Sequence, residues 1–228
     1  MSRTPAGLNP VEVLVSILSE PEPAGLGIEY DWMVSASAES TLTLGRGNCV
    51  SLAMLLVGLG RSLDWPIYFA EARPHEPVLH QLPELNILSS HMIVIVLTQN
   101  GPVFVDFLGL INQSDYDIHP IDDISAYAHL LNNIAAQELT ESSAADTEQW
   151  TRARKRFEYV TRIQPQLGDA WNNLGIAHAR LEQYALARRA YGKAIQLDQS
   201  FGSSKKNLTI METRAANRPA IVSGELSD

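Results

Sequence analysis

The only cysteine of the chain, Cys49, stands where a thiol could become a nucleophile. It follows Gly45-Arg-Gly-Asn and opens an apolar stretch, VSLAMLLVGLGRSL, which predicts a buried helix from about Cys49 to Leu63. The N–H groups and the dipole at a helix N-terminus favour thiolate over thiol. Gly45 and Gly47 would let the backbone pass close to a substrate, and the Cys49 N–H could help to form an oxyanion hole.

A thiolate nucleophile needs a base and a group that orients this base, and both residue types lie downstream of Cys49. His91 opens a β-branched run to Leu97 that predicts a buried strand. Asp106 lies in the run Val103–Leu108, which predicts the return strand of a hairpin. The three residue types therefore predict a Cys-His-Asp site in that chain order.

The contact between His91 and Asp106 depends on the turn within Gln99-Asn-Gly-Pro102. A tight turn at Asn100-Gly101 would leave the two residues on one face but roughly 13 Å apart. A wider turn centred near Thr98-Gln99 would bring them into direct contact. The sequence leaves both registers open.

Other segments complete the first half of the chain. Pro10 followed by VEVLVSIL predicts a short helix, and Trp65–Ala70 predicts a strand. Residues 21–45 and 73–90 are rich in turn-forming residues and are predicted to be mainly loop. The order of helix and strands indicates an α+β fold with a central helix on an antiparallel sheet.

The second half repeats itself. Residues Ala153–Ile163 match Ala187–Leu197 at an offset of 34, and a closing helix is expected at Ser203–Thr213. Residues 168–201 resemble the tetratricopeptide repeat, and residues 124–167 resemble it less closely. The consensus positions are occupied by Trp171, Leu174, Gly175, His178, Ala187, Tyr191 and Ala194.

The first half resembles the transglutaminase-like superfamily in GRGNCVSLAMLLVGLGRSLDWPIYFAEA, followed by HMIVIVL and VFVDF. This superfamily has a papain-like core in which a cysteine opens the central helix and histidine and aspartate follow on neighbouring strands. The resemblance implies acyl transfer on amides through a thioester, with Cys49, His91 and Asp106 as catalytic residues. The second oxyanion donor is not identified by the resemblance, and Trp32 is only a guess. An aromatic residue usually follows the histidine by two positions, whereas Ile93 stands there.

The charge is uneven along the chain. Residues 1–120 have 4 Arg, no Lys and 13 acidic residues, whereas residues 121–228 have 13 of each sign. The acidic half argues against nucleic acid or an anionic membrane as partner and would suit a basic amine or peptide. We expect a transglutaminase-like domain over 1–120, a repeat module over 121–213 and a disordered tail over 214–228.

The sequence also limits compartment and cofactors. No apolar run approaches the ~20 residues of a membrane span, and no signal peptide is recognised, so a cytoplasmic protein is expected, although a trimmed exported chain would look the same. One cysteine permits no intramolecular disulfide and no all-cysteine metal site. We expect neither a cofactor nor a metal, and a protein or peptide as substrate or partner.

Several other clusters have ordinary interpretations. His75 and His80, with nearby glutamates, are more typical of a solvated loop than of a metal site. Arg152, Arg154, Lys155 and Arg156 are more typical of a solvated helix face than of a site for an acidic peptide or carboxylate. The acidic positions before the helical half are predicted to form a polar linker and a helix start rather than a calcium loop; they are Asp115, Asp117, Asp122 and Asp123.

Three functions are therefore open. The first is a cysteine peptidase, amidase or acyltransferase whose repeats recruit its substrate. The second is a non-catalytic scaffold with a degenerate transglutaminase-like core and a peptide-binding groove in the repeats. In the third, Cys49 is a buried structural residue, as lone cysteines often are, and the triad is a coincidence.

Overall fold

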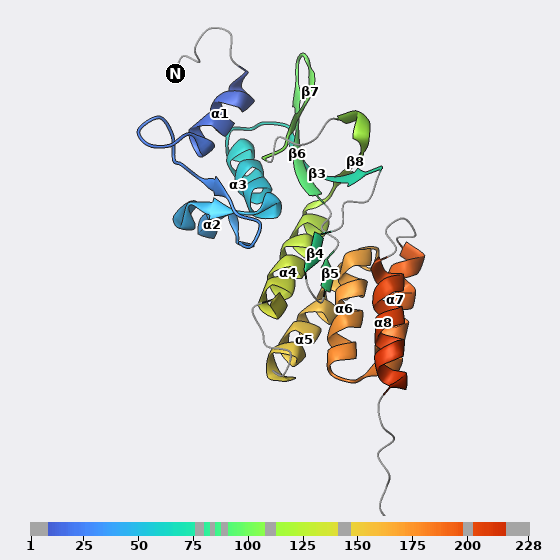
Figure 1. Ribbon diagram of the computed structural model, residues 1–228. Coiled ribbons are helices and arrows are strands. Elements are labelled where there is room, and N and C mark those ends of the chain that lie inside the picture. The colour runs from blue at the N-terminus through green and yellow to red at the C-terminus, as the bar shows by residue number, and fades with distance from the viewer. Residues whose placement is uncertain are drawn as a thin grey trace, which may run out of the picture.

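The computed structural model describes residues 9–75, 80–82, 85–87, 91–107, 113–140, 147–197 and 203–217. Helices and strands are mixed in the first part of the chain, and helices alone form the second part (Figure 1). The first part contains α1 (Pro10–Ser19), β1 (Glu29–Tyr30), α2 (Ala38–Leu44), β2 (Arg46–Gly47), α3 (Cys49–Ser62), β3 (Ile67–Pro74), β4 (His80–Leu82), β5 (Leu85–Ile87), β6 (His91–Thr98), β7 (Gly101–Val105), the 3-10 turn η1 (Gln113–Asp115) and β8 (Tyr116–Ile121). The second part contains α4 (Asp123–Thr140), α5 (Thr147–Ile163), α6 (Gly168–Arg180), α7 (Tyr184–Leu197) and α8 (Ser203–Ala216).

Helix α3 is the centre of the first part and has Cys49 at its N-terminus. Asn48 caps the helix, because its side-chain oxygen accepts a 3.1 Å hydrogen bond from the Ser51 N–H. Most residues of α3 are buried, and the helix packs on β6 and β3. The predicted central helix from Cys49 to about Leu63 is thus confirmed, and so is the short helix that begins at Pro10.

Four antiparallel strands form a curled sheet in the order β7-β6-β3-β8. The side chains of Met92, Val94 and Val96 on β6 join the core around α3. Strand β6 matches its prediction closely, whereas β3 begins and ends later than the predicted Trp65–Ala70. Strand β7 begins before the predicted Val103 and ends at Val105, so Asp106 follows the strand directly.

Two stretches predicted to lack regular structure form strands. Strand β8 lies in the predicted polar linker and pairs with β3, and the β4–β5 hairpin lies in the predicted loop 73–90. Strand β8 was not predicted because its sequence, YDIHPI, is polar and contains Pro120. Proline is tolerated there because β8 is an edge strand of the sheet, and an edge strand does not need every N–H for pairing.

The helices of the second part pack as successive pairs, with α6 and α7 in the most extensive contact (Figure 1). Gly175 on α6 allows the close approach of Tyr191 on α7, because a Cβ added at Gly175 would lie 2.6 Å from the ring. Buried residues between the pairs include Phe157 and Ala177. The predicted closing helix is confirmed as α8, which extends to Ala216.

Helix α4 contacts both parts of the molecule. Its Ala126 and Leu130 belong to the core around α3, whereas Ala135 and Leu139 belong to the core of the helical part. A bidentate ion pair between Arg61 and Asp123 further joins α4 to the end of α3, with both N–O distances at 2.8 Å. The domain boundary at 120–121 therefore stays a prediction, since α4 is shared by two cores.

The predicted disordered tail, 214–228, is helical up to Ala216, and residues 218–228 lie outside the described residues. Among the described helices none is both long and apolar enough to cross a membrane.

Candidate active site

Cys49 occupies the first position of α3 and is 8% exposed. The segment before it is tightly packed, because a Cβ at Gly47 would lie 2.6 Å from the Ser51 Cβ. The Ser51 hydroxyl accepts a 2.8 Å hydrogen bond from the Ala36 N–H, which fastens the preceding loop to the same turn of helix. Internal packing therefore requires a glycine at position 47. Gly45 is the left-handed C-cap of α2, with φ 65°.

His91 and Asp106 meet at the open end of the β6–β7 hairpin. The Nε2 atom of His91 lies 2.6 Å from the Oδ1 atom of Asp106. The side chains are 15% and 10% exposed, so water has little access to this hydrogen bond. The turn is formed by Gln99 and Asn100, one residue earlier than the tight turn considered from the sequence, with Thr98 paired to Gly101.

The Cys49 side chain lies close enough to His91 to favour its protonated form, so the histidine interacts with both the thiol and the carboxylate. Because Nε2 faces Asp106, the other ring nitrogen, Nδ1, is the one available to the thiol. Burial opposes a charge on His91, but the hydrogen bonds to Asp106 and Cys49 and the charges of these two residues raise the pKa of His91 to about 9. The arrangement therefore favours an imidazolium between two groups that can be anions.

Tyr30 is a fourth residue at this site, and the sequence gave no reason to select it. It lies on β1, which pairs in parallel with β2 so that Tyr30 stands opposite Gly47. Its hydroxyl lies close to the side chain and the backbone of Cys49, and both influence its pKa. Burial, followed by the charges of Cys49 and Asp106, raises the pKa of Tyr30 well above its usual value. Tyr30 is therefore a neutral hydroxyl beside the sulfur.

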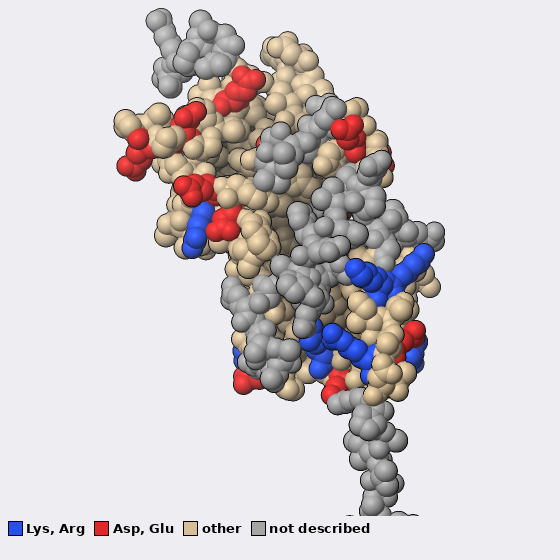
Figure 2. Space-filling view, in the orientation of Figure 1, with Lys and Arg blue, Asp and Glu red and all other residues tan. Residues whose placement is uncertain are grey.

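Trp32, the guess for a second oxyanion donor, is 61% exposed. Acidic side chains surround this part of the molecule, whereas most of the basic ones in the same view lie over the helical part (Figure 2). Arg46 is an exception and forms a 3.3 Å ion pair with Asp31. Acidic and basic residues are thus separated in the folded molecule as they are along the sequence.

The other clusters have local partners. His75 Nε2 lies 3.2 Å from the Asp117 Oδ1, and Asp122 accepts a 2.7 Å hydrogen bond from the Ser125 N–H at the start of α4. The side chain of His80 lies outside the described residues. Where the structure describes the chain, no three His, Cys, Asp or Glu side chains are grouped as metal ligands would be.

The basic cluster of α5 is largely neutralised. Arg152 pairs with Glu148 at 2.6 Å, and two further pairs join Arg154 to Glu158 and Arg156 to Glu138. Among the described residues, no ion pair or hydrogen bond is formed by the remaining cation, Lys155.

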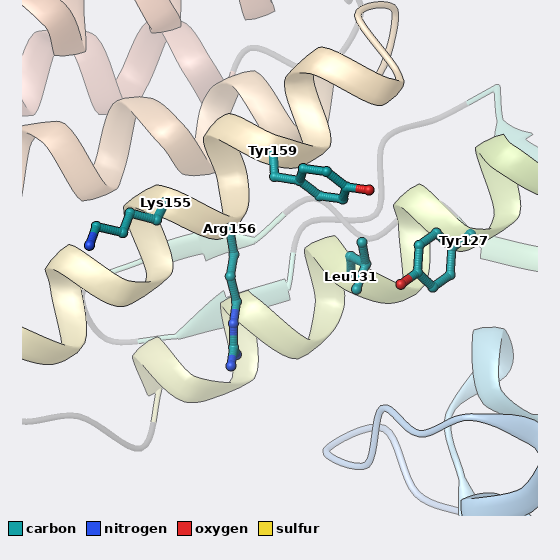
Figure 3. Close-up of a pocket in the computed structure, with 5 residues that line it drawn as sticks. All are labelled: Tyr127, Leu131, Lys155, Arg156 and Tyr159. Atoms are coloured by element: carbon teal, nitrogen blue, oxygen red, sulfur yellow. The ribbon is translucent and has the colours of Figure 1, made fainter.

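A shallow hollow of about 380 Å³ lies between α4 and α5 (Figure 3). Its walls include two tyrosine rings that are each nearly half exposed, and Lys155 and Arg156 lie beside them. The five lining residues are Tyr127, Leu131, Lys155, Arg156 and Tyr159.

The comparisons with known proteins concern the helical part. The family model of the tetratricopeptide repeat matches residues 168–201, which confirms the repeat over that range. No family model of a transglutaminase-like domain matches the chain. No curated protein matches it either. Tetratricopeptide repeats mediate protein–protein interaction, so the helical part indicates a protein that binds other proteins.

Proposed function

We propose that residues 1–120 form a transglutaminase-like domain that carries out cysteine-dependent acyl transfer on amide substrates. The observation that supports this proposal is that His91 forms a 2.6 Å hydrogen bond with Asp106 and also interacts with the thiol of Cys49. A nucleophile, a base and an orienting carboxylate are the three groups that such chemistry requires. Cys49 stands at a helix N-terminus, where a thiolate is favoured.

In the proposed reaction the Cys49 sulfur attacks the amide carbonyl while His91 holds the thiol proton. The carbonyl π electrons move to oxygen and give a tetrahedral oxyanion. This intermediate collapses to a thioester, and the leaving amine takes the proton from His91. Water or a second amine then attacks the thioester, which gives a peptidase or amidase in the first case and a transglutaminase in the second. Asp106 keeps the imidazole oriented and stabilises its cation throughout.

The test is the rate of Cys49 alkylation by iodoacetamide as a function of pH. We expect fast alkylation that persists below pH 7 in the native chain and slows strongly in His91→Ala, because the imidazolium that stabilises the thiolate is lost. His75→Ala is the matched control, since His75 also pairs with an aspartate, Asp117, but in an exposed position. Slow alkylation at the same rate in the native chain and in His91→Ala would refute the proposal and identify Cys49 as a structural residue.

The repeats support a second role, the recruitment of a protein partner. We infer that the hollow between α4 and α5 binds an acidic segment of this partner. Tyr127, Leu131 and Tyr159 offer apolar and aromatic surface to one side chain of such a segment. The amine of Lys155, which pairs with no described residue, complements a carboxylate next to it. A scaffold without catalysis, the alternative function, would use the same surface.

A fluorescent peptide of several glutamates around one phenylalanine is the probe for this surface. We expect saturable binding by fluorescence anisotropy that weakens in Lys155→Glu and at high salt. Lys193→Glu, on α7, is the control with the same change of charge away from the hollow. Equal binding by both variants would exclude the hollow as the binding surface.

A further inference from the structure

Tyr30 is held against the nucleophile by backbone pairing on both sides. The Glu29 N–H donates to the Gly45 carbonyl and the Asp31 N–H to the Gly47 carbonyl, both at 2.9 Å. The parallel strands β1 and β2 place Tyr30 opposite Gly47, two positions before Cys49. Because main-chain bonds fix this register, the side chain of Tyr30 does not depend on a flexible loop for its position.

The hydroxyl of Tyr30 contacts two different groups of Cys49. It lies next to the thiol and next to the Cys49 N–H, and both groups influence the pKa of Tyr30. The ring packs against the core around α3 and is partly buried. A hydroxyl that reaches both the sulfur and this N–H lies next to the point where a carbonyl oxygen arrives when its carbon is attacked by the sulfur.

Acyl transfer by Cys49 needs two donors to the developing oxyanion, and the backbone at the start of α3 supplies one of them. The Cys49 N–H is that first donor. Trp32 does not fill the second place in the described structure, because its side chain is mostly exposed and its indole N–H makes no hydrogen bond to a described residue. Tyr30 is the neighbouring side chain that carries a suitable O–H.

We propose that Tyr30 is the side-chain donor of the oxyanion hole and thus a catalytic residue. This inference rests on the proposed acyl transfer. In the free protein the Tyr30 hydroxyl lies close to the Cys49 N–H, next to the place that the substrate oxygen takes. When the substrate enters, its carbonyl oxygen accepts a hydrogen bond from that N–H, and the Tyr30 O–H donates a second hydrogen bond to the same oxygen. As the oxyanion collapses to the thioester, its electron pair returns to the C=O bond and the leaving group departs.

Two reactions of Cys49 separate this role from a general effect on the thiol. Acylation by p-nitrophenyl acetate passes through an oxyanion and releases p-nitrophenolate, whereas alkylation by iodoacetamide forms the S–C bond directly and releases iodide. We expect Tyr30→Phe to lower the acylation rate by about 100-fold, as for other oxyanion donors. The alkylation rate at high pH, where the thiolate is fully formed, should change far less.

Tyr68→Phe is the matched control, because Tyr68 is an exposed residue of β3. Its two rates should equal those of the native chain, and melting curves should show that both variants fold. If Tyr30→Phe lowers both rates equally, or neither, the oxyanion role is overturned even though Cys49 is reactive. If the native chain itself shows neither fast alkylation nor acylation, the proposed acyl transfer fails, and the role of Tyr30 fails with it.

Discussion

His91 and Asp106 form a 2.6 Å hydrogen bond although they are not partners in the β6–β7 ladder. The ladder ends at the pair of Val94 with Val105, so the same register continued by one residue would set Asp106 opposite Ile93. His91 is the diagonal neighbour of that position on the same face of the hairpin. The long imidazole side chain spans this diagonal, and the hydrogen bond therefore depends on the turn at Gln99 and Asn100.

Asp106→Asn should lower the pKa of His91. The carboxylate contributes both a hydrogen bond and a negative charge that favour the imidazolium, whereas burial opposes it. We expect the His91 ring signals in an NMR titration to show a pKa of about 9 in the native chain and a pKa near or below 6.5 in the variant. Asp117→Asn, which removes the partner of His75, should leave the His91 titration unchanged.

The same pair should make folding stability depend on pH. The folded-state pKa of His91, about 9, is above the unfolded value of 6.5, so the stabilisation is complete below pH 6.5 and is lost as the pH rises through 9. The loss should reach about 3 kcal/mol at most. Urea unfolding at pH values from 6 to 10 measures it, and His91→Ala should not show this part of the pH dependence. A native chain whose stability is constant over this range would contradict the assignment.

The sequence predicted which residue types could form a site, but it did not predict the strand register that sets the distances between them. Cys49, His91 and Asp106 could be selected as candidates because a helix start and two β-branched runs could be predicted from local pattern. The hairpin register was left open, because Asn100-Gly101 is a strong turn signal by itself. In the structure the Thr98 hydroxyl donates to the Gly101 carbonyl at 2.7 Å and helps to place the turn one residue earlier.

Tyr30 could not have been found in the same way. It belongs to a strand of only two residues, and its partner strand is equally short. Neither strand has a period that can be detected, and the contact with Cys49 arises only from their pairing. The repeat, in contrast, was predictable over residues 168–201 because each helix pair uses the same small and large residues to pack.

Gly47→Ala should disturb the start of α3. The added Cβ would lie 2.6 Å from the Ser51 Cβ and 3.1 Å from the Thr41 Cγ2, and both of these residues are buried. We expect a loss of about 1–3 kcal/mol in the free energy of unfolding, together with slower alkylation of Cys49. Gly58→Ala, within α3 itself, is the control, because its Cβ would meet no atom within 4 Å. That variant should be neutral or more stable by up to about 1 kcal/mol.

Gly175→Ala tests the packing of the repeat in the same way. A Cβ at this position would lie 2.6 Å from two ring carbons of Tyr191, and the ring is almost completely buried and cannot move aside freely. Helices α6 and α7 would have to separate, so we expect a loss of about 1–3 kcal/mol. Gly192→Ala, on α7, adds the same methyl group where no atom lies within 4 Å and should not destabilise the chain.

Thermal melting of the two variants tests this prediction, because equal melting temperatures would mean that α6 and α7 do not depend on this contact. If only Gly175→Ala melts early while its Cys49 alkylation rate at low temperature stays native, the helical part is stabilised by this contact independently of the surroundings of Cys49.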